Sequence, residues 1–81
     1  MTTNQIVIDP KIYGGKPCIR GTRIAVTMVL ELLEDGLTFE QILKDYYPQL
    51  KAGDIRACLE YARAVVEGED IHFADGKPLV A

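Results

Sequence analysis

The stretch "GLTFEQILKDYYPQLKAGDI", residues 36–55, contains the start and stop signals of two consecutive helices. Thr38 precedes an apolar pattern, and Gln41 follows three residues later, which is the spacing of a capping box that opens a helix. Pro48 ends this helix at the tyrosines before it, because the residue preceding a proline avoids the helical conformation. A further helix begins near Ala52, so the stretch predicts two helices joined by a tight turn.

Helical patterns continue on both sides of this stretch. Upstream, apolar residues predict a helix over residues 27–35, and Gly36 stands where a left-handed C-cap is expected. Downstream, apolar residues at three- and four-residue steps predict an amphipathic helix that begins near Ala52 and ends at Gly68. An amphipathic stripe of this kind faces a core, and here it consists of Ile55, Cys58, Leu59, Ala62, Val65 and Val66.

The first 24 residues carry short β-branched pieces in place of helical periodicity. Residues 6–8 predict a strand that ends at Asp9 and Pro10. Pro17 excludes a helix just before it and favours an extended conformation at residues 18–19. A third extended piece is expected over residues 23–25. Together these pieces predict a small N-terminal β arm.

The expected fold is therefore mainly α: a three-helix helix-turn-helix bundle with a short N-terminal β arm. In helix-turn-helix modules the final helix reads DNA, but any three-helix bundle shows the same periodicity. One domain is expected, divided into the arm (1–24), the trihelical body (25–67) and an acidic C-terminal tail (68–81). In the tail, the turn signal at Asp75 and Gly76 predicts a weak hairpin or a segment that docks on a partner.

Charge is distributed unevenly along the chain. The net charge is −3, yet the arm carries four bases against Asp9 alone, which gives +3. The body carries four bases against eight acids, and the tail carries Lys77 against three acids. A basic arm on an acidic body is a hint about binding partners. The small size of the chain adds a second hint, because short chains bury little surface and gain from oligomerisation.

Several classes of protein are disfavoured by what the chain lacks. Cys18 and Cys58 match no metal-ligand spacing, and we interpret both as reduced thiols of a cytoplasmic protein, with Cys58 in the core. The polar first residues show no signal peptide, and no apolar run reaches the length of a membrane span. His72 is the single histidine, and the chain contains no serine. We therefore expect no metal, no cofactor, no membrane partner and no enzymatic activity.

The loop "GGKPCIRGTR", residues 14–23, raises the question of phosphate binding. A nucleotide-binding P-loop has four residues between its glycines, followed by Lys and Ser or Thr. Here five residues separate Gly15 from Gly21, and Pro17 lacks the N–H that a phosphate cradle uses. The spacing therefore argues against a nucleotide site, and Arg20 and Arg23 stay available for another partner or for holding the arm to the body.

Binding to DNA or to protein remains open. Affinity for DNA depends on neutralising phosphates, which the basic arm supports and the alternating Arg and Glu of the last helix oppose. The candidate DNA-binding residues are Lys16, Arg20, Arg23, Lys51 and Arg56. Exposed aromatic residues favour protein interfaces instead, and the candidate partner-binding residues are Tyr47, Ile71, Phe73 and Leu79.

These residues resemble a known family. The run "GGKPCIRGTRIAV" (14–26), the turn "GLT" (36–38) and the connection "YPQL" (47–50) are similar to the bacterial domain-of-unknown-function family numbered 433, also described as antitoxin-like. The resemblance covers about residues 6–67. It departs at Lys51, where the family usually has Thr or Ser to cap the last helix, and losing that cap costs about 0.5–2 kcal/mol.

The resemblance implies a homeodomain-like helix-turn-helix fold with a β arm. It also implies an antitoxin that neutralises a PIN-like ribonuclease toxin encoded beside it and binds its own operator DNA. The leading hypothesis is thus a homodimeric, non-enzymatic, DNA-binding regulator of a toxin–antitoxin pair, with the acidic tail as the surface for the toxin. The alternative is a protein-interaction or dimerisation module on the same scaffold, without DNA binding.

Overall fold

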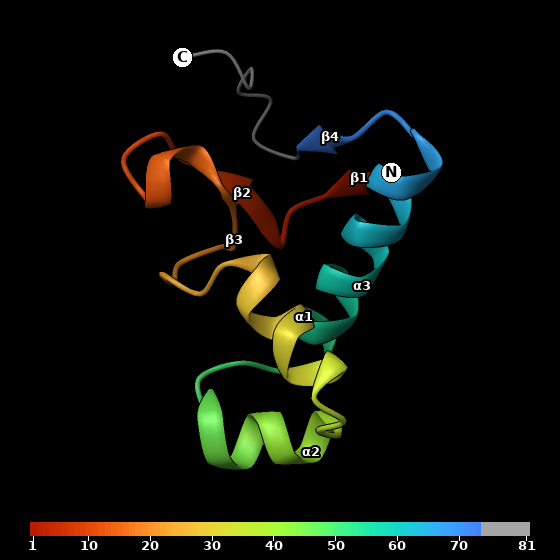
Figure 1. Cartoon of the computed structure of the whole chain (residues 1–81). Coiled ribbons are helices and arrows are strands. Elements are labelled where there is room, and N and C mark those ends of the chain that lie inside the picture. Colours follow the sequence, from red (N-terminus) through yellow and green to blue (C-terminus); the bar gives the residue numbers. More distant parts are fainter. Residues whose placement is uncertain (74–81) are drawn as a thin grey trace.

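The computed structural model describes residues 1–73, and residues 74–81 lie outside the described part. The chain is mainly helical with a small β part (Figure 1). The elements are β1 (Thr2–Thr3), β2 (Ile6–Ile8), the 3-10 helix η1 (Tyr13–Gly15), β3 (Pro17–Ile19), α1 (Val26–Glu34), α2 (Phe39–Gln41), the π-helix η2 (Ile42–Tyr46), α3 (Ala52–Glu67) and β4 (His72–Phe73). The β2–β3 and β1–β4 strand pairs lie toward one end of the molecule, and α2 lies at the other end.

Both longer helices end where their glycines predict. After α1, Gly36 has a φ of 90°, its N–H donates to the Leu33 carbonyl, and the Leu37 N–H donates to the Leu32 carbonyl. Gly68 repeats this arrangement after α3 with a φ of 74°. The paired bonds form a Schellman motif, which satisfies the last carbonyls of each helix. The predicted helix ends are confirmed.

The second helix begins as its capping box predicts. The Gln41 N–H donates to the Thr38 hydroxyl at 3.2 Å, and the Thr38 N–H donates to the Gln41 side chain at 2.8 Å. Beyond α2 the chain continues as a π-helix over Ile42–Tyr46, in which the Tyr47 N–H reaches back five residues to the Ile42 carbonyl. The sequence predicted a continuous helix here but not its wider turn, because the apolar spacing of so short a segment does not separate the two.

The N-terminal arm is partly as expected. Strands β2 and β3 are antiparallel, with Val7 opposite Cys18. The third predicted piece, 23–25, forms only an isolated bridge between Ala25 and Cys18. The short parallel pair of β1 with β4 was not predicted, because two-residue strands carry no periodicity. Through this pair the start of the chain lies beside the segment that follows α3 (Figure 1).

One core unites the arm and the helices. The arm supplies Ile6 and Ile19, which are almost fully buried, so it is packed against the body rather than projecting from it. Helix α1, the π-helix and α3 add Val29, Ile42 and Ile55, which are buried to the same degree. The buried apolar residues of the described part are Ile6, Cys18, Ile19, Ile24, Ala25, Val26, Val29, Ile42, Leu50, Ile55, Ala57, Cys58 and Ala64.

The apolar stripe of α3 is buried over only part of its length, contrary to the prediction. Ile55 and Cys58 are fully buried, but Leu59, Val65 and Val66 are 41, 53 and 87 % exposed. The reason lies in the sides of the helix that the core covers. Ala57 and Ala64, seven residues apart, are buried on one side of α3, whereas Leu59 and Val66, also seven residues apart, lie on another side and stay exposed.

Candidate functional site

A basic face surrounds the start of α3. The arm reaches this point through Gln5, whose side chain donates to the Gly53 carbonyl at 3.4 Å and whose own carbonyl accepts the Arg20 N–H at 2.8 Å. Lys51 and Arg56 lie just before and one turn after Gly53, and both are exposed. These hydrogen bonds bring the backbone of Arg20 close to the start of α3, where Lys51 and Arg56 are exposed, and we call these three residues the basic face.

The Arg20 side chain is also anchored. Its Nε–H donates to the Asn4 carbonyl, so the arginine connects the end of β3 to the segment before β2. The turn that follows depends on Gly21, which has a φ of 76°. The Thr22 N–H donates to the Ile19 carbonyl at 3.1 Å, and the Ile19 N–H donates to the Ile24 carbonyl at 2.9 Å.

The two other candidate DNA-binding residues lie elsewhere. Arg23 is exposed in the turn between β3 and α1, where its charge acts on the Cys18 thiol. Lys16 is exposed at the start of β3, at the edge of a groove beside the end of α3 rather than its start. The structure therefore separates Lys16 from Lys51 and Arg56, which lie toward the other end of α3.

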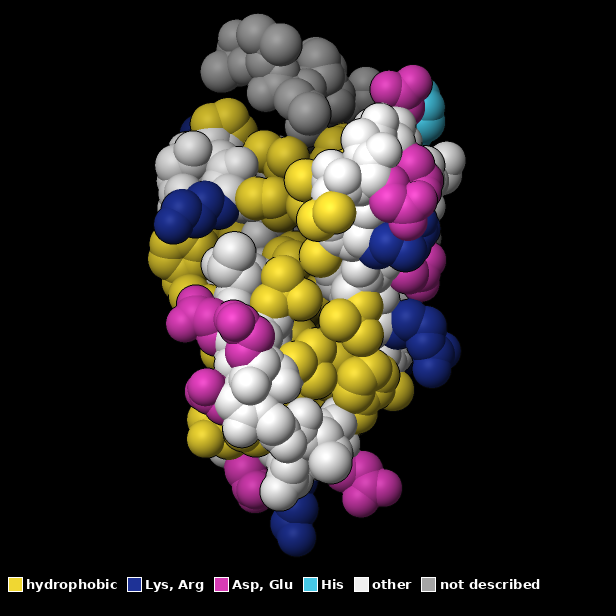
Figure 2. Space-filling view, turned by 45° about the vertical axis from the view of Figure 1, so that its right-hand side comes forward, with side chains coloured by type: hydrophobic (Ala, Val, Ile, Leu, Met, Phe, Trp, Pro, Cys, Tyr) yellow, Lys and Arg dark blue, Asp and Glu magenta, His cyan; other side chains and the backbone are white. Residues whose placement is uncertain are grey.

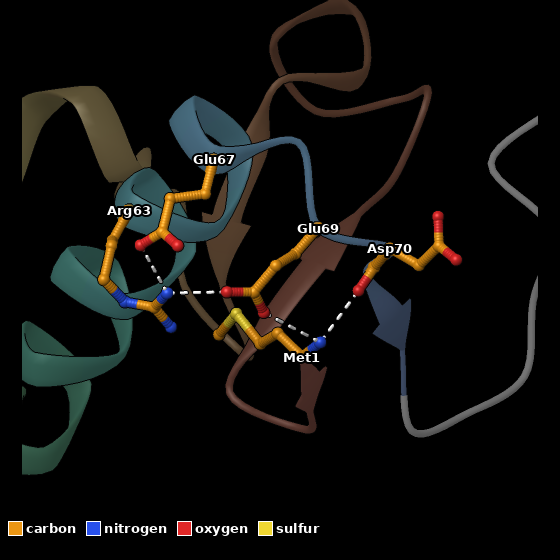
Figure 3. A network of polar contacts seen from close by, with 5 residues as sticks. All are labelled: Met1, Arg63, Glu67, Glu69 and Asp70. Atoms are coloured by element: carbon orange, nitrogen blue, oxygen red, sulfur yellow. Dashed lines mark hydrogen bonds and ion pairs between the residues drawn. The ribbon is translucent and has the colours of Figure 1, made fainter.

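A network of charges closes the end of α3 (Figure 3). Arg63 Nη1 donates to Glu67 at 2.9 Å and to Glu69 at 2.6 Å. The amino group of Met1 lies 3.5 Å from Glu69 and donates to the Asp70 carbonyl at 2.8 Å. The hydrogen bond from Arg63 lowers the pKa of the Glu69 carboxyl. Two carboxylates thus balance the charge of Arg63, so we do not count Arg63 among the cations of the basic face.

An apolar groove lies between α1, the start of β3 and the second half of α3. It has a volume of about 390 Å³. Figure 2 shows apolar side chains in a stripe down one face of the molecule, with charged side chains on both flanks. The groove is lined by Lys16, Pro17, Val26, Thr27, Leu30, Tyr61, Ala62, Val65 and Val66.

The candidate partner-binding residues are only loosely connected to this groove. Phe73 packs at an angle against Tyr61, one of the residues that line the groove, with ring centroids 6.4 Å apart. Tyr47 is half-buried beside Tyr46, after the π-helix, and Ile71 is half-buried before β4. Leu79 and the turn signal at residues 75–76 lie outside the described residues.

The exposed apolar residues of α3 escaped the sequence prediction, which placed Leu59, Val65 and Val66 toward the core; Val65 and Val66 line the groove. No signal in the sequence marked this difference, because periodicity identifies the apolar side of a helix and not the neighbours that cover it.

Both cysteines are unpaired thiols and Cys58 is buried, as the sequence predicted, and Cys18 is buried as well. Burial raises the pKa of the Cys58 thiol to about 12, and the nearby Asp54 carboxylate adds to the effect. Burial also raises the pKa of the Cys18 thiol, against the opposing influence of Arg23. Thiolates are the reactive form of cysteine, so neither side chain is placed as a nucleophile.

Two further properties concern residues 1–73. No cluster of three or more His, Cys, Asp or Glu side chains within this range is arranged to hold a metal ion. None of the helices described combines the length and the apolar character needed to cross a membrane.

Comparison with known proteins gives two matches. The model of the family DUF433, described as a protein of unknown function, matches residues 6–62. The crystal structure of a DUF433 member protein from Anabaena variabilis ATCC 29413 is similar, with a TM-score of 0.72 and 33 % sequence identity. The similarity covers 82 % of this chain but 64 % of that one, less than two thirds of its length. No curated protein matches the chain.

Proposed function

Because this chain belongs to the DUF433 family, we propose that it is a non-enzymatic, antitoxin-type regulator that binds DNA. The observation that carries the proposal is the basic face at the start of α3, formed by Arg20, Lys51 and Arg56. In helix-turn-helix proteins the N-terminal residues of the recognition helix contact the bases, and neighbouring cations hold the phosphates. The proposed helix-turn-helix consists of residues 39–46, the turn at 47–51, and α3.

The charges of this face suit contacts with the phosphate backbone of DNA rather than hydrogen bonds to many bases. Glu60 and Glu67 lie farther along the exposed side of α3 and would repel phosphates. Binding is therefore confined to the first turns of α3 and the adjoining arm. Each phosphate that a cation neutralises adds about 0.9 to the slope of log K against log salt concentration.

A gel shift or anisotropy titration tests this function, with the DNA upstream of the protein's own gene at several salt concentrations. Lys51→Ala is expected to weaken binding and to reduce the salt slope by about one. Arg63→Ala is the matched control, because two carboxylates already balance that charge. Absence of binding at low salt, or equal losses in both variants, would contradict the proposal.

The antitoxin part of the proposal concerns the segment after α3. Glu69 and Asp70 are exposed there, and they continue the acidic character of the end of α3. A ribonuclease holds the phosphate backbone of RNA and therefore presents cations, which an acidic segment complements. We expect this protein to suppress RNA cleavage by a PIN-like ribonuclease encoded beside it, and to co-purify with it. Undiminished cleavage at an excess of this protein would refute the antitoxin role.

A second candidate function is a protein-interaction or dimerisation module without DNA binding. The apolar groove supports it, because exposed apolar surface on a small domain marks an interaction site. The two candidates differ in one measurement: the second candidate predicts that the parent protein does not bind DNA even at low salt.

A further inference from the structure

The exposed part of the α3 stripe forms one continuous apolar patch. Leu59, Ala62 and Val66 are three and four residues apart, so they lie on one face of the helix, with Val65 beside them. Val66 is 87 % exposed, which is unusual for a valine in the middle of an apolar surface. The same face is covered by the core at Ile55 and Cys58. The patch is therefore an extension of a packing surface that lacks its neighbour.

The patch has both parts of a self-complementary contact. Val66 projects from the surface, while Thr27, Leu30 and Ala62 line the hollow beside it. An interface between two identical copies related by a twofold axis uses the same patch twice, so a projection and a hollow must occur together on it. A different protein would need only one of the two.

The charges along α3 point to the same arrangement. The cations Lys51 and Arg56 stand at its start, with Asp54 bonded to the Lys51 N–H. From Glu60 onward the exposed side carries four acids against one base; these are Glu60, Glu67, Glu69, Asp70 and Arg63. Cations at the start of a helix and acids at its end are unfavourable with its dipole. An antiparallel second copy would place acids beside cations at both ends.

We propose that the groove is the interface of a homodimer in which the α3 helices of two copies pack antiparallel. The twofold axis passes close to Ala62, so that Leu59 of each copy contacts Val66 of the other. Arg56 then lies opposite Glu67 and Glu69 of the second copy. The occupant of the groove is this chain itself, since the projection and the hollow belong to one patch and the cations and acids of α3 lie at its opposite ends.

The dimer does not require the proposed DNA binding and is compatible with it, although Arg56 belongs to both. At 1.5 Å per residue, Lys51 lies about 16 Å along the helix from the axis. The starts of the two α3 helices are then about 30 Å apart, close to the 34–36 Å that separates successive major grooves on one side of DNA. Loss of DNA binding in Lys51→Ala and loss of the dimer in a groove variant are separate outcomes.

The oligomeric state of the full chain tests the interface, measured by light scattering after size exclusion and by sedimentation. We expect a dimer whose dissociation constant rises about tenfold or more in Val66→Asp. Because Val66 is exposed, this variant is expected to keep the circular dichroism spectrum of the parent. Gln49→Asp is the matched control, since it adds the same charge at an exposed position outside the groove.

Two further variants test the antiparallel register. Ala62→Cys is expected to form an intermolecular disulfide under mild oxidation, whereas Glu60→Cys, on another side of α3, is not. Cys18 and Cys58 are buried and do not interfere. Arg56→Glu is expected to weaken the dimer, and adding Glu67→Arg is expected to restore it.

Three results would overturn the proposal. The first is a monomeric parent protein. If, in addition, Val66→Asp abolishes binding to the ribonuclease encoded beside this protein, the groove belongs to that partner. The second is a dimer that Val66→Asp leaves intact. The third is a dimer in which Ala62→Cys forms no cross-link.

Discussion

Helix α3 begins without the side-chain cap that helix starts normally have, and Lys51→Ser is predicted to supply it. Lys51 occupies the N-cap position with φ −118° and ψ 162°, and its side chain accepts no hydrogen bond. The other half of a capping box is already present, because the Asp54 carboxylate accepts the Lys51 N–H at 2.9 Å. At the start of α2 the complete arrangement exists between Thr38 and Gln41. The substitution therefore adds one missing acceptor to a prepared site.

The magnitude follows from the energy of an N-cap. Gaining the hydroxyl contributes about 0.5–2 kcal/mol, typically about 1 kcal/mol. For a chain of this size, about 1 kcal/mol raises the melting temperature by about 4–8 °C. The lysine side chain is exposed, so little packing is lost when it is removed.

Thermal and urea unfolding followed by circular dichroism measure this effect. Lys51→Ala is the control, because it removes the same charge without adding an acceptor. The difference between the serine and alanine variants isolates the hydroxyl. Thr38→Ala is expected to lose about the same free energy at α2. If the serine variant is no more stable than the alanine variant, the assignment of an incomplete capping box at Lys51 is wrong.

Three other predictions follow from the core and the charge network. Cys18 and Cys58 should react with a thiol reagent only after unfolding, and rapid labelling of the native protein would show that the thiols are accessible. Ile55→Ala, at a fully buried position, should lower the free energy of unfolding by about 2–5 kcal/mol; a loss below about 1 kcal/mol in urea unfolding would contradict its place in the core. Because Arg63 lowers the pKa of Glu69, the contact stabilises the fold above the ordinary pKa of glutamate and is lost as the pH falls through the lowered value. The protection factor for amide exchange at His72, whose N–H donates to the Met1 carbonyl, should then fall in acid in the parent protein but not further in Arg63→Ala.

The parts of the fold that the sequence predicts are those controlled by neighbouring residues. The capping box at Thr38 and the Schellman motifs at Gly36 and Gly68 depend on bonds that span three to five residues. Pro48 ends the second helix for a reason that is equally local. Such signals operate before any tertiary contact forms, so they are readable in the sequence alone.

The parts that were missed depend on contacts between distant segments. Strand β1 exists because it lies beside β4, about seventy residues later. The basic face was named residue by residue, but its assembly depends on Gln5, which binds Gly53 and Arg20 and has no pattern that marks it. The sequence could therefore not predict which candidate cations lie close together, and in the structure Lys16 lies apart from Lys51 and Arg56.

The α3 stripe shows how a correct local pattern led to a wrong conclusion about burial. The periodicity identified one apolar face on the helix, and the structure places Ile55 and Cys58 of that face in the core. Periodicity does not show which neighbours will cover a helical face, and Leu59, Val65 and Val66 stay exposed although Ala64 among them is fully buried. What remains exposed combines a projecting Val66 with the groove beside it. In a monomer the uncovered part of the stripe is exposed to solvent, and in the dimer that we propose it is buried. Val66→Asp is therefore the substitution whose effect on the oligomeric state distinguishes the monomer from the dimer most clearly.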